Sequence, residues 1–288
     1  MIDSVKIARV FPRKTTATPE DDLVWINEPP PLLAMPEVDE VHISVTFTWD
    51  RQRAEELEKQ WRDVGVPVKI GGPAYGDRMS PDFVPGRYLK QGYTFTSRGC
   101  PNNCWFCSVA KCAKGKIIEL PIQDGYNILD DNLLACSDDH VKKVFKMLAK
   151  QKQRPIFTGG LEAKILKPWH AAELRKVKAS RMYFAYDTPD DYEPLIEAGK
   201  IMRAEGHSVL SHSMRCYLLI GYPNDTMEAA EKRLIDTVKA GFVPYAMLWR
   251  DEKGEVSKDW AKFQREWCRP AIVGKKVGEI WKGEQHEQ

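Results

Sequence analysis

Residues 93–107 read YTFTSRGCPNNCWFC, and this stretch decides how the 288-residue chain folds. Aromatic and small polar residues alternate over residues 92–97, which predicts a β-strand. Gly99 and Pro101 interrupt the alternation. A loop is therefore expected to leave the end of this strand, and it carries Cys100, Cys104 and Cys107.

Three thiolates on so short a loop can converge on one soft metal centre. A structural zinc site takes four ligands. Three cysteines on an iron–sulfur cube instead leave one iron without a protein ligand, open to a substrate or cofactor. The other cysteines are scattered and form no second C-x2-C, so we expect no auxiliary cluster and mainly a buried, hydrophobic role for Cys112, Cys136, Cys216 and Cys268.

The C-x3-C-x2-C spacing, with Phe106 at the aromatic position, closely resembles the signature of the radical S-adenosylmethionine (radical SAM) superfamily. The flanking residues resemble its branch of methylthiotransferases and cobalamin-linked enzymes, and the whole chain resembles short uncharacterised radical SAM proteins of phage and prophage type. The resemblance implies a [4Fe-4S] cluster on Cys100, Cys104 and Cys107, whose fourth iron chelates S-adenosylmethionine (SAM). It also implies an external electron donor of flavodoxin or ferredoxin type, and cleavage of SAM to methionine and a 5′-deoxyadenosyl radical.

Strand and helix patterns alternate six times after residue 91, which predicts an α/β fold with a parallel sheet. Right-handed crossovers would curl this sheet into a partial, TIM-like (β/α)6 barrel, the form that radical SAM cores have. We expect an N-terminal βαβ cap and linker over 1–90, the radical SAM partial barrel over 91–250 and a C-terminal helical tail over 251–288. The predicted strands of the barrel cover 92–97, 126–129, 155–158, 182–186, 216–220 and 243–248.

Ligands of parallel α/β folds bind at the carboxyl ends of the strands, and polar residues gather there in this sequence. The resemblance implies that the residues after the second strand hold the SAM amino group, although the family's usual Gly-Gly-Glu motif is absent there. It also implies a strand-five motif near adenine, which begins at Gly221. The predicted cofactor-binding residues are Phe106, Asp130, Asp131, Asn132, Gly159, Gly160, Glu162, Asp187 and Gly221, and no catalytic residue is assigned.

Residues 41–49, 51–64 and 66–70 read as one βαβ unit that ends in Gly71-Gly72-Pro73. This unit resembles the last part of the cobalamin-binding domain that precedes some radical SAM enzymes. It is too short for the whole domain, and the D-x-H-x-x-G motif is missing, since His42 does not match it. Cobalamin is therefore not expected, and a reduced cap that packs on the barrel is.

The composition fits a cytoplasmic globular protein. Hydrophobic residues make up 43% of the chain, and the net charge of +2 implies no nucleic-acid or membrane partner. No apolar run reaches the ~18 residues of a membrane span, and Met1-Ile2-Asp3-Ser4 does not begin a signal peptide. A row of lysines that includes Lys142, Lys143 and Lys146 is expected on the outer face of a barrel helix.

The sequence thus predicts a radical SAM enzyme that abstracts hydrogen from an unknown substrate, with a nucleotide or nucleic acid favoured. A peptide or a small metabolite are the other substrate classes. The alternative is a non-enzymatic module with a three-cysteine metal site, and zinc without iron or sulfide would support it.

Overall fold

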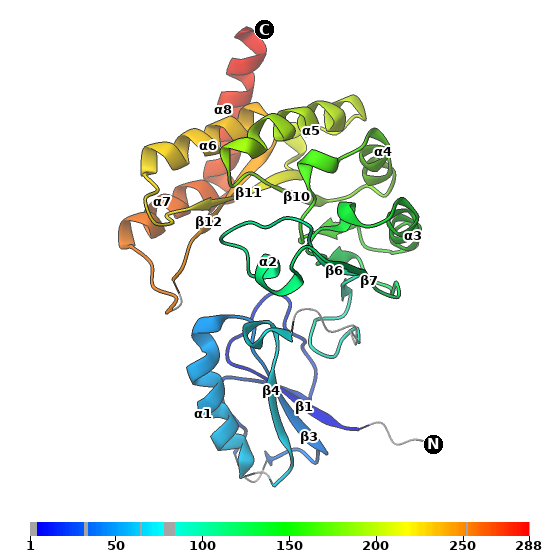
Figure 1. Ribbon diagram of the computed structural model, residues 1–288, viewed down its shortest axis with the longest axis vertical. Coiled ribbons are helices and arrows are strands. Elements are labelled where there is room, and N and C mark those ends of the chain that lie inside the picture. Colours follow the sequence, from blue (N-terminus) through cyan, green and yellow to red (C-terminus); the bar gives the residue numbers. More distant parts are fainter. Residues whose placement is uncertain (1–4, 32–33, 64, 78–83, 252, 288) are drawn as a thin grey trace.

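The larger sheet holds six parallel strands in the order of the chain. The computed structural model (Figure 1) describes residues 5–31, 34–63, 65–77, 84–251 and 253–287. The strands are β5 (Tyr93–Thr94), β8 (Asn127–Ile128), β9 (Ile156–Phe157), β10 (Arg181–Ala185), β11 (Met214–Ile220) and β12 (Val243–Leu248). Their positions agree with the six predicted strands, and β5 and β12 form the two edges of an open sheet. The curvature of a partial barrel therefore stays a prediction.

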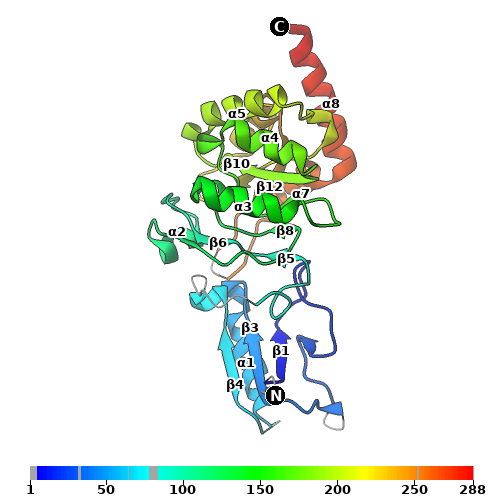
Figure 2. The ribbon, with the colours of Figure 1, turned by 90° about the vertical axis from the view of Figure 1, so that its right-hand side faces the viewer.

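Helices follow the strands and cover the sheet (Figure 2). These helices and strands share one apolar core. Strand β11 shows why, because its residues alternate between buried and half-buried along the whole strand. Such alternation turns every second side chain toward the helices and leaves the others on the opposite face of the sheet. The helices that contribute buried residues to this core are α3 (Asp138–Leu148), α4 (Pro168–Lys176), α5 (Tyr192–Ala204), α6 (Met227–Lys239) and α7 (Lys258–Cys268).

Two helices form the C-terminal region, where the sequence predicts a helical tail. Helix α7 (Lys258–Cys268) packs against β12, and Trp267 is almost fully buried there. Helix α8 (Pro270–Glu287) contacts α6 and α7 and then extends beyond the sheet (Figure 1).

The N-terminal region is larger than the single βαβ unit expected from the sequence. It contains a parallel sheet in the order β2-β1-β3-β4, with its own apolar core under helix α1 (Arg51–Arg62). Strand β1 pairs with both β2 and β3, and this pairing joins the irregular first 40 residues to the sheet. The predicted helix end at residue 64 and the expected N-terminal Met1-Ile2-Asp3-Ser4 segment lie outside the described residues. The strands are β1 (Ile7–Phe11), β2 (Val24–Ile26), β3 (Glu40–Ser44) and β4 (Val68–Gly71).

The predicted strand over residues 92–97 divides into two short strands. Strand β5 ends at Thr94, and β6 (Ser97–Gly99) pairs in antiparallel fashion with β7 (Ile117–Glu119). The division has a physical cause, because the buried carboxylate of Asp130 accepts hydrogen bonds from the backbone nitrogen and hydroxyl of Thr96 and from the hydroxyl of Ser97. The segment between β6 and β7 carries the three cysteines and helix α2 (Ser108–Ala113).

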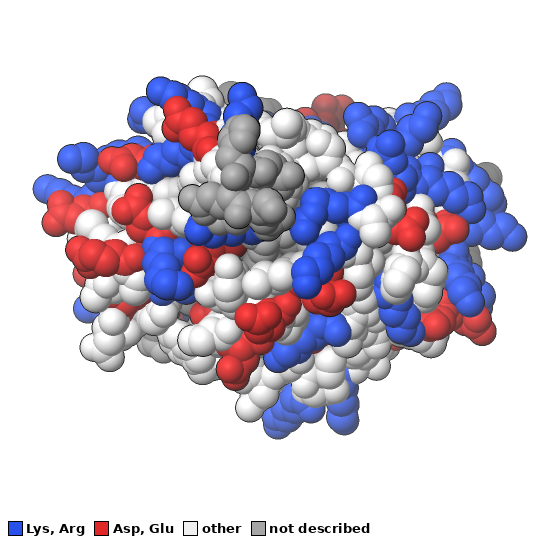
Figure 3. All heavy atoms as spheres, turned by 90° about the horizontal axis from the view of Figure 1, so that it is seen from above, with Lys and Arg blue, Asp and Glu red and all other residues white. Residues whose placement is uncertain are grey.

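Acidic and basic side chains are mixed on the face around the C-terminal end of the molecule (Figure 3), in keeping with the small net charge. Lys142, Lys143 and Lys146 are exposed on α3, as the sequence predicts. Within the described residues, no helix is both long and apolar enough to span a membrane.

Candidate functional site

The cysteine loop begins where only glycine fits. Gly99 ends β6 with φ +92°, and a Cβ at this position would lie 2.0 Å from the carbonyl oxygen of Lys116. Its backbone nitrogen donates a hydrogen bond of 2.8 Å to Asp131 Oδ2. The loop is thereby anchored beside the carboxyl end of β8 before the first cysteine.

The thiols of the loop lie close enough together to affect the pKa of Cys100 and of Cys104. Burial raises the pKa of Cys104 to about 11, and the nearby thiols of Cys107 and Cys100 add to the increase. Burial also raises the pKa of Cys100, and Glu162 and Cys107 act in the same direction. Thiols held in this way are protonated at neutral pH, so the binding of a metal centre would release protons.

A zinc ion and an iron–sulfur cluster require different arrangements of three thiols. Among the residues that the structure describes, no three His, Cys, Asp or Glu side chains are arranged to hold a metal ion. One zinc ion would need every sulfur at ~2.3 Å from the same point. In an iron–sulfur cube each cysteine binds a different iron, so its sulfurs stand further apart.

Asn132 connects the cysteine loop to the polar residues after β9. Its side-chain nitrogen donates hydrogen bonds to Cys100 Sγ at 3.5 Å and to Glu162 Oε2 at 2.6 Å. The amide is buried, and its Oδ1 atom has no hydrogen-bond partner among the described residues. A buried acceptor without a donor is costly, so this oxygen is ready to accept a hydrogen bond from a ligand.

Asp130 and Asp131, two other predicted cofactor-binding residues, bond to the chain itself. Asp130 is 1% exposed, and burial raises the pKa of its carboxyl group. Its hydrogen bonds to Thr96 and Ser97 hold the segment that leads into the cysteine loop. Asp131 holds the next residues through Gly99. These contacts make both carboxylates positioning groups, and direct contact with a cofactor stays a prediction.

Two predicted glycines allow the ends of β8 and β9 to approach closely. A Cβ on Gly159 would lie 2.0 Å from the carbonyl oxygen of Asp130, and one on Gly160 would lie 2.8 Å from that of Asp131. In this structure their lack of a side chain serves strand packing. Their predicted contact with a cofactor is an additional role that the packing does not require.

The remaining predicted residues lie along the same edge of the sheet. Asp187 follows β10 and accepts a hydrogen bond from the backbone nitrogen of Leu219. Gly221 follows β11 with φ +71°, and a Cβ there would lie 2.9 Å from the ring of Trp260. The exposed Trp105 packs edge-on against both Phe106 and Tyr222, with ring centroids 5.4 and 5.6 Å apart. The cysteine loop thus reaches from β6 to the end of β11.

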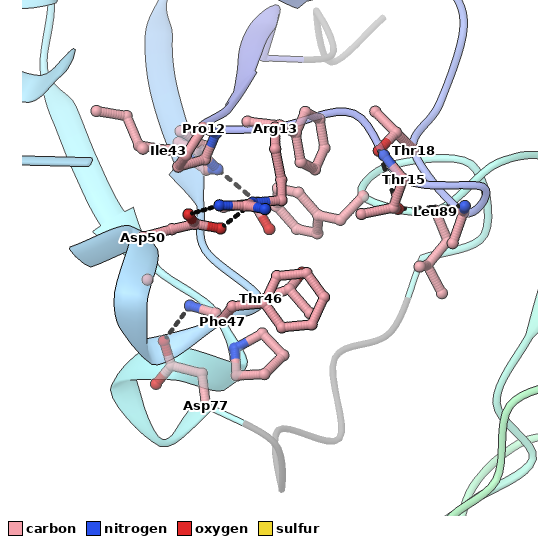
Figure 4. Close-up of a pocket in the computed structure, with 18 of the residues that line it drawn as sticks. Pro12, Arg13, Thr15, Thr18, Ile43, Thr46, Phe47, Asp50, Asp77 and Leu89 are labelled. Atoms are coloured by element: carbon pink, nitrogen blue, oxygen red, sulfur yellow. Dashed lines mark hydrogen bonds and ion pairs between the residues drawn. The ribbon is translucent and has the colours of Figure 1, made fainter. Parts of the chain in front are cut away.

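A cavity that the sequence did not reveal lies between the two parallel sheets. It has a volume of about 560 Å³ and is lined from the N-terminal sheet by residues that include Arg13, Phe47 and Asp50 (Figure 4). Phe95, directly after β5, and Arg98, in β6, line it from the other side. The sequence shows that these residues follow strands or precede the cysteines. It does not show that the residues after β1 and β3 lie side by side, because this depends on the pairing of those two strands.

The fold is similar to that of a solved radical SAM methyltransferase, TsrM from Kitasatospora setae, with cobalamin and a [4Fe-4S] cluster bound. The TM-score is 0.59 at 11% sequence identity, and the match covers 84% of this chain and 74% of that chain. Similarity at this level concerns the fold, which is therefore consistent with a radical SAM architecture. No protein-family model matches the sequence, and no curated protein matches it either.

Proposed function

We propose that this chain is a radical SAM enzyme, in which Cys100, Cys104 and Cys107 hold a [4Fe-4S] cluster. When bound, the cluster would supply the electron that cleaves SAM to methionine and a 5′-deoxyadenosyl radical, after reduction by a donor of flavodoxin or ferredoxin type. This radical would take a hydrogen atom from a substrate, and 5′-deoxyadenosine would result. The protein would work in the cytoplasm.

One observation carries this proposal, namely that Asn132 touches Cys100 Sγ while its own buried Oδ1 atom has no hydrogen-bond partner among the described residues. An ammonium group is a strong donor to such an oxygen. SAM presents an ammonium beside its carboxylate, so Asn132 Oδ1 would accept from it next to the open iron. Asp130 and Asp131 keep the loop in place through Thr96, Ser97 and Gly99.

Metal analysis after anaerobic reconstitution tests the proposal. The wild-type chain is expected to hold about four irons and four sulfides. Cys104→Ala should lose most of both, whereas Cys112→Ala, on α2 outside the motif, should retain them. A chain that holds zinc without sulfide would instead support the three-cysteine metal-binding module.

Cobalamin does not enter the proposal, although the TsrM structure contains it. His42 is a histidine that lines the cavity between the sheets. Its Nδ1 atom is hydrogen-bonded to the Tyr88 hydroxyl and its Nε2 atom to Glu40 at 2.7 Å. Since both ring nitrogens are engaged, a corrinoid ligated by this histidine does not fit the arrangement.

A further inference from the structure

The cavity between the sheets lies at the carboxyl ends of strands from both of them. On the N-terminal side, Pro12 and Arg13 follow β1, and Thr46 and Phe47 come shortly after β3. The order β2-β1-β3-β4 reverses direction at β1 and β3, where open parallel sheets bind their ligands. On the other side, Phe95 and Leu129 directly follow β5 and β8. The cavity therefore lies at the switch point of the N-terminal sheet and at the carboxyl ends of two strands of the larger sheet.

Each side of the cavity contributes an arginine that lies over a phenylalanine ring. The guanidinium carbon of Arg13 is 5.8 Å from the ring centroid of Phe47, and that of Arg98 is 3.3 Å from the centroid of Phe95. A guanidinium on an aromatic ring is a flat cationic surface, which suits planar, conjugated ligands with negative charge. Two such surfaces, one after β1 and one at β6, line the same cavity.

Arg13 is held in place by two of its three guanidinium nitrogens. Its Nε atom donates to Asp50 Oδ2 at 2.6 Å and its Nη2 atom to Asp50 Oδ1, as Figure 4 shows. Asp50 is buried, whereas half of the Arg13 side chain is exposed. Its Nη1 atom makes no hydrogen bond to the other described residues, so it can donate to an anionic ligand without any rearrangement.

The size of the cavity limits what it can hold. A volume of about 560 Å³ lies within the ~300–1,000 Å³ of pockets that enclose a drug-sized ligand. A mononucleotide has this size, and it combines a planar base with an anionic phosphate. A corrinoid with its nucleotide tail is much larger, and a nucleic-acid strand would have to leave the cavity at both ends.

We propose that the cavity between the two sheets binds a free nucleotide, which is the substrate of the radical reaction. Arg98 lines the cavity and precedes Cys100 by two residues, so the ligand lies beside the cluster loop. In the reaction, a C–H bond of the nucleotide breaks and a C–H bond forms at the 5′ carbon of the deoxyadenosyl radical, which leaves the unpaired electron on the nucleotide. The role as substrate rests on the proposed radical SAM function, whereas the binding does not.

Binding is tested on the full chain with its reconstituted cluster, by titration calorimetry with each ribonucleoside and deoxyribonucleoside monophosphate. At least one should bind at one per chain. Arg13→Ala removes a charge-assisted hydrogen bond and should weaken that binding about 10- to 100-fold. Arg13→Lys keeps a partner for Asp50 but lacks the flat guanidinium, so its affinity should fall as well, with the fold retained. The matched control is Arg175→Ala, in a different surface hollow, which should bind like the wild type.

Several results would overturn the proposal. They are a wild-type chain that no mononucleotide saturates, wild-type affinity in both Arg13 variants, and an oligonucleotide that binds without competition from mononucleotides. With a ligand in hand, deuterium from the labelled nucleotide should appear in 5′-deoxyadenosine. If SAM is cleaved but no nucleotide binds, the site fails and the radical SAM function stands. If a nucleotide binds but SAM is never cleaved, the function fails and the binding site stands.

Discussion

The side-chain nitrogen of Asn132 lies 3.5 Å from Cys100 Sγ, so a residue after β8 touches the first cysteine of the loop. The same nitrogen donates to Glu162 after β9. This amide therefore joins three segments of the chain at one edge of the sheet. Its oxygen, which has no partner in the described part of the chain, is the group that we assign to the SAM ammonium.

Replacement of Asn132 should affect SAM more than the cluster. Asn132→Ala removes one charge-assisted hydrogen bond, worth about 1.5–3 kcal/mol, so SAM should bind roughly 10- to 100-fold more weakly. Iron and sulfide should stay near the wild-type values, because the three thiols remain. Equilibrium dialysis with labelled SAM measures the affinity. Asn103→Ala, which changes an exposed amide within the loop, is the control and should not alter it. Unchanged affinity in Asn132→Ala would remove the assigned role.

Gly159→Ala should destabilise the fold. The added Cβ would lie 2.0 Å from the Asp130 carbonyl oxygen, so the ends of β8 and β9 would have to separate. Overpacking of this kind costs about 1–3 kcal/mol, and more where backbone must move. Gly278→Ala is a matched control on α8, where a Cβ meets nothing within 4 Å, and it should leave stability equal or slightly higher. Urea denaturation of both variants checks the expectation, and a stable Gly159→Ala would contradict the strand packing.

The fold and the cysteine loop could be predicted from the sequence because both depend on local patterns. The strand–helix alternation placed β8 to β12 within a few residues of their positions, and the C-x3-C-x2-C spacing identified the loop. The division of the first strand could not be predicted, since it depends on the Asp130 carboxylate, 34 residues away from Thr96. The N-terminal sheet was underestimated for the same reason, because β1 and β3 pair across a proline-rich segment.

The candidate site shows the same limit. A carboxylate at a strand end looks alike in the sequence whether it faces a ligand or the chain, and Asp130 faces the chain. The Arg13–Asp50 pair joins residues 37 positions apart, so no motif reveals it. What a local pattern cannot supply in both cases is the tertiary partner of a polar side chain.

The carboxyl group of Asp187 should make the stability of the fold depend on pH. Burial, together with the charge of Asp191, raises the pKa of Asp187 from an ordinary 3.8 to about 6. The folded chain thus binds the proton more tightly than the unfolded chain, and the free energy of unfolding should fall as the pH rises from about 4 to 6. Because the carboxyl group retains some exposure, the loss should be at most about 3 kcal/mol.

Asp187→Asn removes this titration and keeps an acceptor for the Leu219 nitrogen. The variant should match the wild type at pH 4 and be more stable at pH 8. Thermal denaturation at the two pH values gives the comparison. A variant that is less stable than the wild type at pH 8 would show that the ionised carboxylate stabilises the fold.

Cobalamin should not bind tightly. Both ring nitrogens of His42, which lines the cavity, are hydrogen-bonded to Tyr88 and Glu40. The sequence also lacks the D-x-H-x-x-G motif. Protein is prepared without its cluster, incubated with hydroxocobalamin and then desalted. It is expected to show no corrinoid absorption. Stoichiometric retention of the corrinoid would contradict this expectation and would also assign the cavity to a larger ligand.

The most direct test of the central claim is the release of 5′-deoxyadenosine from SAM. Reconstituted protein, reduced with dithionite and given SAM without any substrate, should form it slowly, and Cys104→Ala should form none. Chromatography with mass detection measures the product. The account predicts 5′-deoxyadenosine and methionine in equal amounts from the wild type. A wild-type chain with a full complement of iron and sulfide that leaves SAM intact would contradict it.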